Sequence, residues 1–211
     1  MRRGSLSGVG ALAFGILPFV GFMIANPPGG TYKVSDIVDY VTKGHRPAVF
    51  LSMYLLLASG VGLAILLTRL REAIEGRTRV WVFTTLAGAA VAAWVVGYAL
   101  VIGVPAAYAF GGGDHLSLAP GIVYTFAEAG WAVMYGAGGT LLGCALVVFA
   151  IGRVAVPSWV RWTTLVAGIA GLASLAWFPF FIVYIWAIVL GCWLLVAASG
   201  PAREPARPQL A

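Results

Sequence analysis

The residues that could carry chemistry are few, and most of them fall between residues 110 and 135. Asp114 and His115 are adjacent, and Glu128 follows in the same region. Because an imidazole titrates near neutral pH, a histidine beside a carboxylate could exchange protons with it. No nucleophile motif accompanies these residues, so an ordinary polar loop is the alternative interpretation of Asp114 and His115.

A metal site is the second chemistry to consider, since histidine nitrogens and carboxylate oxygens ligate zinc. The only other histidine is His45, and the chain contains no H-x-x-x-H or H-E-x-x-H spacing. Haem held between helices is disfavoured as well, because no long apolar stretch contains a histidine. We therefore expect neither a metal nor a cofactor.

Glu128 is the carboxylate closest to a long apolar stretch, and carboxylates at such positions in membrane proteins often mark function. Aromatic side chains near it could supply apolar walls with polar tips, as ligand pockets require. The sequence thus predicts a small-molecule site formed by Asp114, His115, Tyr124, Glu128, Trp131 and Tyr135. The alternative is that Glu128 contacts water and lipid head groups while the aromatics mark a membrane boundary.

The composition indicates the environment of these side chains. Of 211 residues, 61% are hydrophobic and 9% are charged, against about 25% charged in soluble domains. Only helices and closed barrels can span lipid, because every backbone polar group must be paired internally. Barrel strands alternate apolar and polar residues, whereas the apolar stretches here are continuous. The chain is therefore predicted to be an all-α polytopic membrane protein.

Six apolar stretches approach the ~20 residues that one crossing needs: 6–25, 48–67, 80–103, 129–151, 162–178 and 180–199. We expect a single six-helix domain over residues 1–200 and a disordered cytoplasmic tail over 201–211. The third helix should end at Pro105, and the last two should form a hairpin that turns at Pro179. A cleaved signal peptide is the alternative for 6–25, although a small-residue cleavage site is lacking.

The basic residues predict an orientation. Ten of the thirteen fall on the side that holds both termini, and Lys33, Lys43 and Arg46 fall on the other. Because cytoplasmic loops carry excess positive charge, both termini are expected in the cytoplasm of a bacterial inner-membrane protein. The net charge of +6 is thereby explained without nucleic acid. The outer segment 26–47 should contain a short amphipathic helix with Ser35 as its N-cap.

Small residues recur at spacings of three and four on two of the expected helices. Such faces let helices approach closely in lipid, where no hydrophobic effect drives helix pairing. The third and fourth helices are therefore predicted to pack through Ala93, Gly97, Gly139 and Gly143.

The layout of the chain also has a precedent. A first helix ends in a Pro/Gly turn and is followed by "SDIVDYVTKGHRPAVFLSMYLLL", then "RLREAIEG", then "VPSWVRWTTLVAGIAGLASLAW". These segments are spread over most of the length of the chain, and in them the protein resembles a domain-of-unknown-function family of small six-helix polytopic membrane proteins from high-GC bacteria. The resemblance implies the six-helix fold and supplies no catalytic residues.

Taken together, these patterns predict a non-enzymatic membrane protein. It would bind a lipid or an apolar small molecule, or serve as an accessory subunit of a membrane complex, with the bilayer and another membrane protein as partners. One alternative is a membrane enzyme with an outward-facing site near His115 and Glu128. Another is a small secondary transporter, although such proteins commonly have broken helices and polar groups at the membrane midplane.

Overall fold

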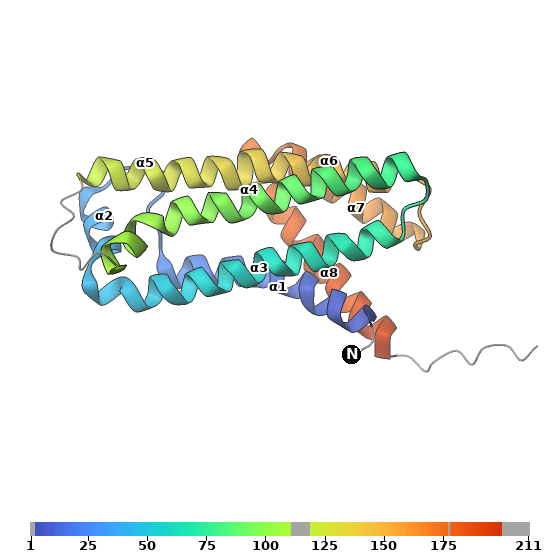
Figure 1. Ribbon diagram of the computed structural model, residues 1–211, viewed down its shortest axis with the longest axis horizontal. Coiled ribbons are helices and arrows are strands. Elements are labelled where there is room, and N and C mark those ends of the chain that lie inside the picture. The colour runs from blue at the N-terminus through green and yellow to red at the C-terminus, as the bar shows by residue number, and fades with distance from the viewer. Residues whose placement is uncertain (1–2, 111–118, 177, 200–211) are drawn as a thin grey trace, which may run out of the picture.

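The protein is a bundle of helices, shown in Figure 1. The computed structural model describes residues 3–110, 119–176 and 178–199. Four long helices are α1 (Arg3–Ala25), α3 (Arg46–Glu72), α4 (Arg77–Phe110) and α8 (Phe180–Ser199). A fifth runs without interruption through α5 (Pro120–Trp131), the π-helical segment η2 (Ala132–Gly139) and α6 (Thr140–Ala150). Shorter elements are α2 (Val34–Val41), α7 (Ser158–Leu172) and the 3-10 turns η1 (Lys43–His45) and η3 (Ser174–Ala176).

Five helical segments within the described residues are long and apolar enough to cross a membrane. These are Gly4–Ala25, Arg46–Glu72, Arg77–Ala107, Pro120–Ala150 and Phe180–Ser199. Helix α7 has 15 residues, fewer than the ~20 of an ordinary crossing. The prediction of an all-helical chain is confirmed for the described residues, and five of their helices could span a membrane; the sixth crossing stays a prediction. The predicted tail 201–211 lies outside the described residues.

The two ends of the bundle differ in character. At one end, the loop after α3 pairs with the loop after α6, because Glu75 N–H donates to the Arg153 carbonyl at 3.0 Å. The described termini lie toward the same end, where a side chain added at Gly4 would meet Ala198. We call this the arginine end, after Arg69, Arg71, Arg77, Arg79, Arg153 and Arg161. The opposite end carries α2 and is called the α2 end.

Helix α4 does not end at Pro105, as the sequence had predicted, but continues to Phe110. Proline lacks an N–H, so the carbonyl four residues earlier, that of Val101, has no helical donor. The Tyr40 hydroxyl of α2 donates to this carbonyl at 3.0 Å. Burial raises the pKa of Tyr40, so its hydroxyl keeps the proton that it donates. A donor from another helix thus satisfies the carbonyl that Pro105 leaves without a partner.

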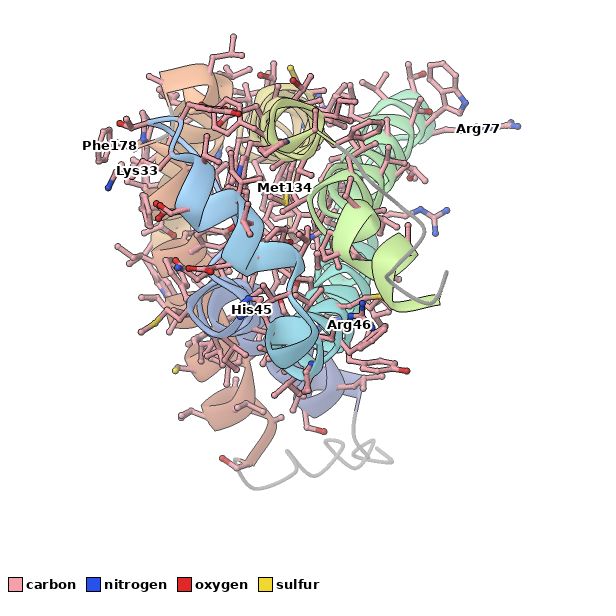
Figure 2. The ribbon with its side chains drawn as sticks, turned by 90° about the vertical axis from the view of Figure 1, so that its left-hand side faces the viewer. Lys33, His45, Arg46, Arg77, Met134 and Phe178 are labelled. Atoms are coloured by element: carbon pink, nitrogen blue, oxygen red, sulfur yellow. The ribbon has the colours of Figure 1, made fainter. Side chains whose placement is uncertain are left out.

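A short helix, α2, lies within the segment 26–47, but its predicted N-cap is wrong. That this segment faces the outside of a membrane stays a prediction. Lys33, with an extended backbone, occupies the N-cap position, and Ser35 lies inside the helix. Ile37 and Tyr40 are buried against the bundle. His45 Nε2 donates a hydrogen bond to the Ala25 carbonyl, at the end of α1, at a distance of 2.5 Å. The segment therefore docks across the end of the bundle, as Figure 2 shows from that side.

The predicted small-residue seam between the third and fourth long helices is half correct. A Cβ added at Gly97 would lie 2.6 Å from Met134 Cβ, and one at Gly138 would lie 3.4 Å from Ala93 Cβ. Gly139 and Gly143 face elsewhere: Gly139 meets Ser174 and Phe180, and Gly143 meets Gly168 of α7. Small residues lie on several faces of this helix, so spacing alone could not select the face that meets α4.

Candidate functional site

Four of the six predicted site residues lie along one long helix. Tyr124, Glu128 and Trp131 follow one another on a single face of α5, and Tyr135 lies one turn further on, in η2. Asp114 and His115 fall outside the described residues. Helix α4 extends to Phe110 and α5 begins at Pro120, so the helices run past the predicted stretches 80–103 and 129–151, and residues 104–110 and 120–128 are helical as well.

Three side chains of α5 hold the turn that follows α1. The Tyr124 hydroxyl donates to the Gly30 carbonyl, and Glu128 Oε1 accepts from the Gly30 N–H at 2.9 Å. The Trp131 indole N–H donates to the Pro28 carbonyl at 3.3 Å. Gly30 has φ of 75°, which glycine adopts without strain. Glu128 therefore binds the backbone of the turn rather than pointing into bulk solvent.

An apolar cavity of about 210 Å³ opens beside this turn. Its lining is almost wholly aromatic and carries no charged residue: Pro18, Phe19, Phe22, Met23, Trp131, Tyr135, Phe180, Phe181 and Tyr184. Met23 of α1 is 83% exposed and Phe181 of α8 is 46% exposed, whereas Phe180 and Tyr184 are buried. The cavity thus opens sideways between α1 and α8, on the lateral surface of the bundle.

Hydrogen bonds and ring contacts fix the inner wall of the cavity. The Tyr135 and Tyr184 hydroxyls lie 3.2 Å apart and form the polar point of an otherwise apolar wall. The Ser174 hydroxyl donates to the Tyr135 carbonyl at 2.6 Å, which ties the turn before α8 to η2. Trp131 and Tyr135 stack, with ring centroids 5.7 Å apart. The wall is therefore pre-formed rather than dependent on a ligand.

A second hollow, more open and of about 530 Å³, adjoins the first toward the α2 end. It is lined by Pro27, Gly29, Gly30, Glu128 and Trp131. Trp131 belongs to both linings. The apolar cavity and the hollow that contains Glu128 therefore share Trp131 as a common wall.

Sequence reasoning named Trp131 and Tyr135 but missed the contributions of α1 and α8. Phe180 and Tyr184 belong to the predicted apolar stretch 180–199, whose sequence does not show that both side chains are buried in the bundle. Phe19 and Phe22 of α1 contact the rings of Tyr184 and Trp131, respectively. The spacing of three between the two phenylalanines does not predict these partners. No group of three or more histidine, cysteine or acidic side chains gathers around a possible metal within the described chain.

No family model, curated protein or solved structure matches this chain. The resemblance to a family of six-helix membrane proteins therefore stays a prediction.

Proposed function

We propose that this protein is a multi-pass inner-membrane protein that takes one hydrocarbon chain of a bilayer lipid sideways into the cavity between α1 and α8. The observation that carries the proposal is the nine-residue lining without a charge, with exposed Met23 and Phe181 at its mouth. A cavity of about 150 Å³ lined by apolar side chains stays dry and binds benzene in another protein. A pocket of about 210 Å³ is of the size and character to hold part of a lipid chain.

The topology that we propose has six crossings, with both termini in the cytoplasm. The chain enters and leaves at the arginine end, where Gly4 lies beside Ala198, and an even number of crossings is needed for this. Helix α7 supplies the sixth, as a short crossing that leads to the turn at Ala173–Pro179. Arginines gather at this same end, as cytoplasmic loops require.

Chemical crosslinking tests the binding of a lipid chain directly. The protein is reconstituted in phosphatidylcholine nanodiscs that contain a phospholipid with a diazirine at the end of one acyl chain, and the labelled peptides are identified by mass spectrometry. We expect saturable labelling of residues 18–23 and 180–184, which unlabelled phospholipid reduces. Uniform, non-saturable labelling that extends to lipid-facing positions such as Val189 and Val196 would overturn the proposal.

A pair of variants on α1 provides the matched control. Phe22 lines the cavity, whereas Val20 is 38% exposed and lies outside the lining. Phe22→Trp narrows the cavity and should lower the labelling of residues 180–184 severalfold. Val20→Trp adds a ring of the same size outside and should leave the labelling unchanged.

A further inference from the structure

We infer that the bound lipid is an aminophospholipid, whose head-group ammonium is recognised by Glu128 while one acyl chain occupies the cavity. This inference rests on the proposed function and names the class of lipid. Its basis is the wall that the two hollows share: Trp131 lines the apolar cavity on one side and the hollow containing Glu128 on the other. A single amphiphile is the kind of ligand that would fill both.

The carboxylate is available to such a head group. Glu128 is partly exposed, its Oε1 accepts a hydrogen bond from Gly30, and the neighbouring Tyr124 hydroxyl also interacts with its carboxylate. No ion pair joins it to a cation of the described residues. A carboxylate accepts through two oxygens, so Oε2 can receive a further donor. A negative group in this position favours a cationic partner that carries N–H donors.

Three common head groups differ in just these properties. Ethanolamine presents a primary ammonium with three N–H donors, and a hydrogen bond that carries charge is about twice as strong as a neutral one. Choline carries the same charge without an N–H group. A glycerol head group carries no positive charge to offset the negative charge of the phosphate, so Glu128 and the phosphate repel each other. The expected order of preference is therefore ethanolamine, then choline, then glycerol.

Head-group variants of the photoactivatable lipid test this order. Lipids with ethanolamine, choline or glycerol heads and the same diazirine chain are compared in phosphatidylcholine nanodiscs. Ethanolamine should label residues 18–23 and 180–184 about fivefold more than glycerol, the ratio expected from a hydrogen bond to a charged group at a partly exposed site. In Glu128→Gln, which keeps an acceptor for Gly30, this ratio should approach one. Glu72→Gln is the matched control, because Glu72 pairs with Arg69 at the arginine end, and it should leave the ratio unchanged.

Each other outcome has one meaning. Equal labelling by the three lipids, or a preference for glycerol that Glu128→Gln does not change, overturns the inference and leaves the proposed function intact. Equal labelling by choline and ethanolamine overturns recognition through N–H donors. Absence of cavity labelling with every head group overturns the proposed function itself.

Discussion

At the scale of single residues, two buried serines of α3 differ in whether their hydroxyls are hydrogen-bonded. Ser52 and Ser59 are both fully buried. The Ser59 hydroxyl donates to the Leu56 carbonyl at 2.7 Å and accepts from the Trp94 indole N–H at 3.2 Å. The Ser52 hydroxyl has no hydrogen-bond partner among the described residues. The sequence could not separate the two, because the partner of Ser59 stands on another helix.

Replacing each serine by alanine should have opposite consequences. Ser59→Ala leaves the indole N–H of Trp94 without an acceptor, and we expect the free energy of unfolding to fall by about 1–3 kcal/mol. Ser52→Ala removes a hydroxyl that satisfies nothing, so stability should be unchanged or slightly higher. Unfolding in detergent measures both variants. Equal losses in the two would show that the bond between Ser59 and Trp94 contributes nothing.

The candidate site was predictable at this scale only in part. Trp131 and Tyr135 could be named because large aromatics with polar tips near a carboxylate are typical of pockets. Glu128 lies in the adjoining hollow instead of the cavity, since it binds the Gly30 N–H. The hydrogen bond between Gly30 and Glu128 joins residues far apart in the sequence, so no local sequence pattern predicts it.

At the scale of elements, the existence of the helices could be predicted and their ends could not. Hydropathy located every long helix, because lipid and helix burial both select continuous apolar runs. It misjudged Pro105, since the donor that permits α4 to continue is Tyr40 of a different helix. The end of α4 thus depends on a tertiary partner, because the carbonyl that Pro105 leaves without a helical donor finds one on α2.

Helix pairing gives a prediction that belongs to this scale. A Cβ added at Gly143 would lie 2.7 Å from the Gly168 carbonyl oxygen of α7, while one added at Gly88 of α4 would meet nothing within 4 Å. Gly143→Ala should therefore force α6 and α7 apart and lower the free energy of unfolding by about 1–3 kcal/mol. Gly88→Ala should stabilise α4 by about 0.5–1 kcal/mol, because alanine favours the helix.

The melting temperatures of the two variants in detergent supply the measurement. A loss at Gly143 together with a gain at Gly88 is the expected pattern. A Gly143→Ala protein as stable as the parent would mean that α6 and α7 do not pack as closely as described.

At the scale of the whole molecule, the orientation can be tested with single cysteines. Cys144 and Cys192 are first replaced by alanine, and then Lys33→Cys or Arg77→Cys is introduced. Both positions are exposed, Lys33 next to α2 and Arg77 at the start of α4, which lie at opposite ends of the bundle (Figure 1). We expect an impermeant maleimide to label Lys33→Cys in intact cells and Arg77→Cys only after permeabilisation. The reverse pattern would contradict the proposed topology.

The pairing of α1 with α8 has a consequence for how the protein is made. These helices run antiparallel, with Gly4 beside Ala198, Gly8 beside Leu195 and Gly15 beside Ile188. Helix α1 is therefore synthesised well before α8, the helix against which it packs. At ordinary rates of synthesis, of about 5–20 residues per second, α1 waits roughly 10–30 s for this partner. During that interval its glycine-lined face is open to lipid or to an insertion factor, and the cavity acquires the wall that α8 supplies only after α8 has been synthesised.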